Sequence, residues 1–183
     1  MLYDLLTAGT AGRGTTIQSL SIEAYDLMYA AHKGVIQFYD VHTIVSGGAA
    51  WGDQLAIRAY LEGDIESLRI NIPGMFDTKS CTFKVRDRND KADHIKTCNH
   101  YHSQMEGKGI PSRKQIAEAI EKGAQVYSYQ DFFRRNIVST QMARRMVAFT
   151  FASGDTPADG GTKFTWDRFN GPKVHIPIAS LGK

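Results

Sequence analysis

Three glycine-rich segments, each following an apolar stretch and preceding a helical pattern, constrain what this chain of 183 residues can fold into. The segment Ser46-Gly-Gly-Ala-Ala-Trp-Gly-Asp53 follows a short apolar run that begins at Ile44. The residues after it repeat at the spacing of one helical face: Leu55, Ala56, Ala59 and Tyr60. A strand, a glycine turn and a helix N-terminus place free backbone N–H groups together. The segment therefore predicts either an anion site or a tight turn without a ligand.

This central segment differs from the two most familiar phosphate loops. No Gly-Lys-Ser or Gly-Lys-Thr follows it, as a P-loop requires, and it does not match G-x-G-x-x-G. Any ligand has to be inferred from the combination of loops.

A second glycine-rich segment, Ala8-Gly-Thr-Ala-Gly-Arg-Gly14, follows a strand expected at residues 2–7. Its arginine, Arg13, is either a bidentate partner for a phosphate or a solvated loop residue. We expect a helix to begin after it, capped by Thr15 or Thr16.

The third segment runs from Ala152 to Thr162 and follows the most apolar strand, expected at residues 146–151. Because that strand is so apolar, we expect it near the centre of the sheet. Thr162 would offer its hydroxyl and its N–H group at the start of a short helix, which again suits a phosphate.

Further strands are expected at residues 41–45, 67–72, 124–129 and 174–178, with helical patterns between most of them. This alternation predicts an α/β fold with a three-layer, Rossmann-like parallel sheet flanked by helices. Pro177 indicates a sheet edge or a strand end. Since ligands bind at the carboxyl ends of parallel strands, the glycine loops are expected to converge on one ligand.

Residues 75–111 interrupt the pattern and are expected to be an insertion or an elaborated loop, either a cover for the pocket or an oligomer interface. The segment contains Cys98-x-His100-x-His102, which suggests zinc ligands if the chain is extended there. The spacing matches no standard closed zinc site, so we assign no metal and no cofactor.

Two helices are expected after this segment. Ser112, with Gln115 three residues later, predicts a capping box. Residues 131–145 are expected to form one helix, and it would contain four arginines: Arg134, Arg135, Arg144 and Arg145. They indicate an acidic ligand, a nucleic-acid face or a solvated helix with basic ends.

Composition excludes few classes of protein. The net charge is only +3, which does not by itself imply a nucleic-acid partner. Two cysteines make no disulfide framework, so we expect a cytoplasmic protein. No apolar run approaches the length of a membrane span, and no membrane partner is expected.

The chain resembles the SLOG superfamily of Rossmann-like proteins in three motifs that occur in the same order: Ser46-Gly-Gly-Ala-x-x-Gly-Asp53, Arg135-Asn136 and Gly160-Gly-Thr162. That superfamily includes DprA-like DNA-processing proteins, Lonely Guy phosphoribohydrolases and nucleotide-signal sensors of bacterial defence. We expect one domain over residues 1–183, and the resemblance covers this domain except for residues 75–111. The resemblance implies that the domain binds a nucleotide-like small molecule, often as a homo-oligomer. The ligand contacts we expect come from Gly9, Thr10, Arg13, Ser46, Gly47, Gly48, Gly52, Arg135, Asn136, Gly160, Gly161 and Thr162.

The chain departs from the phosphoribohydrolases at one motif. They have P-G-G-x-G-T followed closely by paired glutamates, whereas here Ala158-Asp-Gly-Gly-Thr162 leads into Lys163-Phe-Thr-Trp-Asp167. Cleavage of an N-glycosidic bond needs a carboxylate near the sugar carbon. Asp53 and Asp167 are the catalytic candidates.

Three functions follow from this sequence. The first is a sensor or sequestering protein for a nucleotide or an ADP-ribose-like molecule. The second is an N-glycosidic hydrolase of nucleotides or nucleosides. The third is a DprA-like partner of single-stranded nucleic acid, which the low net charge and the absence of aromatic residues clustered on a basic face disfavour.

Overall fold

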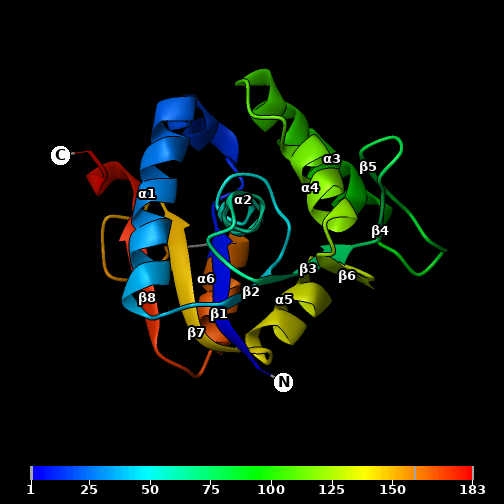
Figure 1. Cartoon of the computed structure of the whole chain (residues 1–183). Helices are drawn as coiled ribbons and strands as arrows, with labels where there is room; N and C mark the ends of the chain where they lie inside the picture. Colours follow the sequence, from blue (N-terminus) through cyan, green and yellow to red (C-terminus); the bar gives the residue numbers. More distant parts are fainter. Residues whose placement is uncertain (1, 159, 183) are drawn as a thin grey trace.

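The computed structural model describes residues 2–158 and 160–182. Six parallel strands form its central sheet in the order β6-β3-β2-β1-β7-β8, with β1 in the interior (Figure 1). The strands are β1 (Tyr3–Gly9), β2 (Thr43–Ser46), β3 (Ser67–Pro73), β6 (Gln125–Tyr129), β7 (Ala143–Thr150) and β8 (Lys173–Pro177). The α/β fold and the parallel sheet predicted from the sequence are therefore confirmed, as are the edge position of Pro177 and the interior position of the apolar strand β7.

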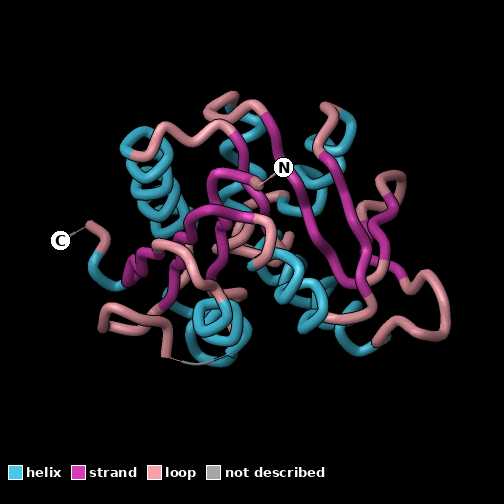
Figure 2. The backbone as a smooth tube through the Cα atoms, turned by 90° about the horizontal axis from the view of Figure 1, so that it is seen from below, coloured by secondary structure: helices cyan, strands magenta, loops and turns pink. Residues whose placement is uncertain are grey.

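Helices cover both faces of this sheet and complete three layers (Figure 2). They are α1 (Ile22–Phe38), α2 (Gln54–Glu62), α3 (Ala92–Gly107), α4 (Ser112–Glu121), α5 (Phe132–Thr140) and α6 (Gly160–Arg168), with short 3-10 turns η1 (Gly14–Ser19) and η2 (Ile178–Ser180). No helix among the described residues is long and apolar enough to cross a membrane.

Alternation along the central strands divides the core between the two faces. Leu5 pairs in register with Ile44, and both belong to the larger apolar cluster, which also contains buried residues of α1, α2 and α4. Leu6 pairs with Val45, and both belong to a second cluster that includes Trp166 of α6. Successive side chains of a strand point to opposite faces, so α1, α2 and α4 cover one face and α6 the other.

The strand order places a topological switch point beside β1. From β1 the chain moves outward through β2 and β3 to β6, and then returns to β7 on the other side of β1. The connections after β1 and after β7 therefore diverge, which leaves a crevice at the carboxyl ends of these two strands.

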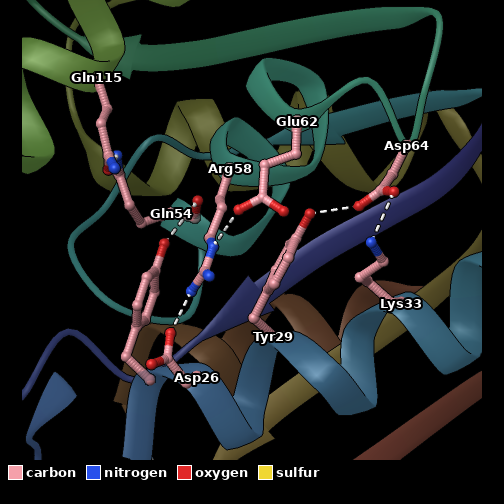
Figure 3. A network of polar contacts seen from close by, with 9 residues as sticks. Asp26, Tyr29, Lys33, Gln54, Arg58, Glu62, Asp64 and Gln115 are labelled. Atoms are coloured by element: carbon pink, nitrogen blue, oxygen red, sulfur yellow. Dashed lines mark hydrogen bonds and ion pairs between the residues drawn. The ribbon is translucent and has the colours of Figure 1, made fainter. Parts of the chain in front are cut away.

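A polar network holds α1 against α2 on the first face (Figure 3). Arg58 of α2 donates to Asp26 of α1, with 2.6 Å between nitrogen and oxygen. The hydroxyl of Tyr29 donates to Asp64, and the ammonium group of Lys33 lies 2.9 Å from the same carboxylate. These contacts fix α1 relative to α2, which begins at the glycine loop after β2.

The segment 75–111 contains a two-stranded antiparallel hairpin, β4 (Met75–Asp77) and β5 (Thr82–Lys84), followed by α3. It is tied to the central loop through His102 of α3. Nε2 of this histidine lies 3.1 Å from the carbonyl oxygen of Gly48, and its Nδ1 lies 2.9 Å from the hydroxyl of Ser112. Because a carbonyl only accepts, Nε2 bears the proton and Nδ1 accepts from the serine.

The extended conformation assumed for the zinc hypothesis is wrong. Cys98, His100 and His102 lie on the helix α3, where Cys98 and His102 are buried and His100 is exposed. Among the described residues, no group of three or more His, Cys, Asp or Glu side chains is placed to hold a metal ion.

Two helix starts also differ from the sequence-based prediction. Residues after the first glycine loop form the turn η1, and α1 begins only at Ile22, where the Ser21 hydroxyl accepts from the N–H of Ala24. Ser112 does not cap α4 with its side chain; it is the first helical residue, and its hydroxyl is used by His102. At α1, Ser21 is the cap in place of Thr15 or Thr16. At α4, a tertiary hydrogen bond to His102 uses the hydroxyl that the capping box would need.

The single helix predicted over residues 131–145 is also wrong. Asp131 is the N-cap of α5, its carboxylate accepting from Arg134 N–H, and the helix ends at Thr140. Arg144 and Arg145 lie at the start of β7, at the amino edge of the sheet, whereas α5 begins beside the carboxyl edge. The four arginines therefore do not share one surface.

Candidate functional site

A cavity of about 1120 Å³ opens where the carboxyl ends of β1 and β7 diverge. Its floor comes from the ends of these strands and from the loop after β2. Its walls come from the loop after β1, the starts of α5 and α6, and one side of α3. All three glycine-rich segments therefore contribute to one cavity, as their positions after parallel strands predict.

The floor is built by backbone contact between the first two loops. The N–H of Gly9 donates to Oδ1 of Asp53 at 3.0 Å, and the N–H of Gly52 donates to the carbonyl of Thr10 at 3.1 Å. The other carboxylate oxygen of Asp53 accepts from the N–H of Ala49 at 3.2 Å. Asp53 thus holds the end of β1 and the loop after β2 in a fixed arrangement.

Asp53 is almost fully buried, with 4% of its surface exposed. Burial raises the pKa of its carboxyl, while Arg135 and the N–H groups that point at the carboxylate act in the opposite direction. A carboxylate in this position serves first as an acceptor for the surrounding backbone.

Arg135, from the second turn of α5, lines the cavity with 6% of its surface exposed. Its Nη1 donates to the carbonyl of Gly47 at 2.5 Å, and its Nε donates to Oδ1 of Asn136 at 3.1 Å. Its Nη2 makes no hydrogen bond to any described residue. The guanidinium is therefore positioned by the protein and retains donor capacity toward the cavity.

Gly47 allows this arrangement because it has no side chain. A Cβ at this position would lie 2.5 Å from Oδ2 of Asp53 and 2.9 Å from Cζ of Arg135. The first of these distances is far below van der Waals contact, so only glycine fits between the carboxylate and the guanidinium.

The N-terminus of α6 forms another side of the cavity. The Thr162 hydroxyl donates to the carbonyl of Gly9 at 2.9 Å, which fixes the helix start to the end of β1. The Nδ2 of Asn136 donates to the carbonyl of Gly161 at 3.4 Å. The N–H groups of a first helical turn lack intrahelical acceptors. Free donors of this kind are what the sequence analysis expected of Gly160–Thr162.

His175 of β8 holds the chain that follows β7 at Thr150 and Gly154, and the sequence analysis did not identify this residue. Its Nδ1 lies 2.7 Å from the carbonyl of Gly154, and its Nε2 lies 2.7 Å from the hydroxyl of Thr150. The carbonyl can only accept, so Nδ1 bears the proton and the threonine hydroxyl donates to Nε2. The sequence indicates only that His175 lies in the last strand, where side chains point alternately to the two faces of the sheet.

One side of α3 supplies the wall from segment 75–111: His94, Thr97, Cys98 and Tyr101. Their spacing of three, four and seven residues is that of one helical face. Burial raises the pKa of the Cys98 thiol to about 12, so this side chain is a neutral, weakly polar part of the wall. The sequence analysis expected this segment to be either a cover for the pocket or an oligomer interface, and its contribution to the cavity wall agrees with the first alternative. The four residues themselves were not identified, because the segment was not recognised as helical.

Most of the residues expected to contact the ligand line the cavity, and so does the catalytic candidate Asp53: Gly9, Thr10, Arg13, Gly47, Arg135, Asn136, Gly160, Gly161 and Thr162. Ser46, Gly48 and Gly52 are not among the lining residues. The hydroxyl of Ser46 donates to the carbonyl of Asp53 at 2.9 Å and accepts from the N–H of Gly48 at 3.3 Å, so these residues shape the loop behind the lining.

Asp167, the second catalytic candidate, is not among the lining residues either. Its carboxylate lies on the exposed side of α6, paired with the Lys163 ammonium group at 2.6 Å. The position of Asp167 does not suit attack on a ligand in this cavity.

Comparison with known proteins identifies one relative of similar length. The chain is 28% identical over 183 residues to an uncharacterized protein of Acanthamoeba polyphaga mimivirus, and the match covers 96% of each chain. No protein-family model matches the chain, and no solved structure matches it.

Proposed function

We propose that this chain binds a nucleotide or a nucleotide-derived, ADP-ribose-like small molecule in the cavity between β1 and β7, as a sensor or a sequestering protein. The observation that supports this proposal most is Arg135, a nearly buried guanidinium that lines a large cavity and whose Nη2 has no partner among the residues that the structure describes. A buried cation is costly unless it meets an acceptor, and a phosphate is a bidentate acceptor for guanidinium.

The surroundings of Arg135 favour an anion as well. The first turn of α6 presents backbone N–H groups at the positive end of its dipole, and Arg13 lines the cavity from the loop after β1. The resemblance of these segments to the SLOG superfamily supports the same class of ligand.

Cavity size is consistent with a ligand larger than a single phosphate. Drug-sized ligands occupy cavities of about 300 to 1000 Å³. At about 1120 Å³, this cavity has room for a nucleoside with one or more phosphates and a second sugar.

Hydrolysis of the N-glycosidic bond is the second candidate, because Asp53 is the sole carboxylate among the described residues that line the cavity. However, each of its oxygens accepts a backbone N–H, from Gly9 and from Ala49. Asp53 would have to give up one of these bonds to act as a base or a nucleophile, so binding without cleavage is the better-supported function.

Calorimetric titration of the purified chain with AMP, ADP, ATP, NAD and ADP-ribose tests the proposal. We expect at least one of them to bind, and Arg135→Gln to weaken its binding at least tenfold. Arg134→Gln is the matched control, because Arg134 precedes Arg135 on α5 but is exposed and does not line the cavity.

Arg13→Gln separates binding from folding, because Arg13 is an exposed loop residue that lines the cavity. We expect this variant to melt like the wild type and to bind the same nucleotide more weakly. If no nucleotide binds the wild type, or if neither variant changes the affinity, the proposal is wrong.

A further inference from the structure

An aromatic cluster lines the cavity beside Arg135, whose guanidinium carbon lies 5.2 Å from the centroid of the Phe132 ring. It consists of His94 from α3, Phe132 and Phe133 from α5, and Phe164 from α6, all of which line the cavity. The His94 and Phe132 rings stack with centroids 4.4 Å apart and an interplanar angle of 14°. The Phe133 and Phe164 rings meet edge to face at 5.0 Å. Four rings from three helices thus form one aromatic surface.

Local hydrogen bonding and charge fix this cluster in place. The backbone N–H of Phe132 donates to Nδ1 of His94 at 3.2 Å, which joins α5 to α3. The guanidinium carbon of Arg168 lies 3.6 Å from the centroid of the Phe164 ring and covers one of its faces. Surfaces that are ordered before binding lose less entropy when a ligand arrives.

Phe133 is the most unusual member, because 54% of its surface is exposed. Packing in the core does not explain a phenylalanine at the start of a helix with more than half of its surface in contact with solvent. Large apolar side chains exposed beside a concave polar site are typical of ligand-binding surfaces.

The cluster lies close to the anion site along α6. Gly160, Gly161 and Thr162 form the first turn of this helix, and Phe164 follows in the next turn. Four residues of an α-helix span about 6 Å, which is comparable to the length of one sugar ring with its exocyclic carbon. A ligand with a phosphate at the helix start can therefore reach the aromatic cluster through a single ribose.

We propose that the cluster around Phe133 and Phe164 is the subsite for a planar aromatic ring of the ligand. This inference rests on the proposed function and narrows it. The ligand class is a nucleobase joined through ribose to a phosphate, rather than a sugar phosphate or a bare polyphosphate. Because stacking on aromatic rings tolerates every base, the subsite selects for the presence of a ring more than for its identity.

This inference is tested with pairs of ligands that differ in whether they carry a nucleobase. Calorimetric titrations compare AMP, GMP, CMP and UMP with ribose 5-phosphate, on the wild type and on Phe133→Leu. We expect the tightest of the four nucleotides to bind the wild type at least tenfold more tightly than ribose 5-phosphate. Phe133→Leu is expected to lose about tenfold in nucleotide affinity and to leave ribose 5-phosphate unchanged, since stacking is lost and the anion site is intact.

Two further variants complete the design. Phe133→Trp retains a ring, so it should preserve nucleotide affinity and show quenching of the new fluorescence on binding. Phe38→Leu is the control, because Phe38 is also exposed, at 80%, but lies on α1 and does not line the cavity.

The inference is overturned if nucleotides bind the wild type and Phe133→Leu binds them equally well, or if ribose 5-phosphate binds as tightly as they do. Either result would leave the proposed function standing. If none of the nucleotides binds the wild type, the proposed function fails and this inference fails with it.

Discussion

Gly9 and Gly52 pack backbone to backbone beneath the cavity, so closely that a Cβ on Gly52 would lie 2.4 Å from the Cα of Gly9. This contact brings the end of β1 against the loop after β2. The hydrogen bonds from Gly9 to Asp53 and from Gly52 to Thr10 depend on the same close approach. The two glycines are therefore required by packing, and neither needs to touch a ligand.

Gly52→Ala is expected to destabilise the protein because the added methyl group meets backbone atoms that cannot move independently. Overpacking of this kind costs about 1 to 3 kcal/mol, and the upper end applies to a backbone clash. Gly34→Ala is the control, because a Cβ there meets nothing within 4 Å and the residue lies inside α1. It should stabilise the protein by roughly 0.5 to 1 kcal/mol. Urea denaturation measures both, and equal stability of the two variants would contradict the packing argument.

Gly47→Ala is expected to weaken nucleotide binding at least tenfold. The new Cβ would displace the Arg135 guanidinium, whose Cζ lies 2.9 Å from that position, and break its bond to the Gly47 carbonyl. Gly154→Ala is the matched loop control, because a Cβ there meets nothing within 4 Å. Calorimetric titration checks both variants. Full affinity in Gly47→Ala would show that the position of Arg135 does not matter for binding.

Stability is expected to fall as the pH decreases below about 6.5, owing to two buried histidines. Burial lowers the pKa of His102 to about 4 and that of His32 to about 3, whereas an unfolded histidine titrates near 6.5. Between these values only the unfolded chain takes up the proton. The stability that these two histidines contribute is therefore complete above about pH 6.5. It is lost progressively as the pH falls toward their pKa values in the folded protein.

The slope of the free energy of unfolding against pH reaches at most about 1.4 kcal/mol per pH unit for each histidine. Urea denaturation at pH 7.5, 6.0 and 5.0 measures it. His102→Gln should flatten the dependence, and His100→Gln should not, because His100 is exposed on the same helix. A free energy of unfolding that does not change between pH 7.5 and 5.0 would contradict this assignment.

Asp53→Asn is expected to destabilise the protein by about 1 to 3 kcal/mol, because the amide nitrogen cannot accept the N–H that one carboxylate oxygen now accepts. Asp167→Asn, on the exposed side of α6, should change neither stability nor binding. Chromatography of incubated nucleotides should detect no free base with the wild type or with either variant. Release of base by the wild type that Asp53→Asn abolishes would instead support the hydrolase.

The strands and the glycine loops could be predicted because their signals are local. Apolar runs such as Ile44–Ser46 end at glycines, and the alternation of strands with helices implies a parallel sheet. Since all carboxyl ends of a parallel sheet share one edge, the meeting of Gly9, Gly47 and Gly161 at one cavity follows from the order of elements alone.

The remaining parts of the site depend on contacts between distant segments. His94 and Phe164 are 70 positions apart, and nothing local to either indicates that both line one cavity. His175 fixes a loop that ends more than ten residues before it, through a carbonyl group that no sequence pattern identifies. Similarly, Ser112 with Gln115 three residues later predicted a helix cap, whereas the Ser112 hydroxyl bonds to His102 on a helix that the sequence analysis did not identify.

Nucleotide binding in this cavity is best tested by mass spectrometry of the small molecules released by denaturing the purified protein. The protein would first be incubated with the nucleotide panel and NAD and then freed of excess ligand. We predict that an intact nucleotide or nucleotide derivative is retained by the wild type and that Arg135→Gln retains much less. Detection of a free base together with a ribose phosphate would instead show that the protein hydrolyses the N-glycosidic bond. If nothing is retained and nothing is cleaved, the cavity does not bind a nucleotide and the proposed function is wrong.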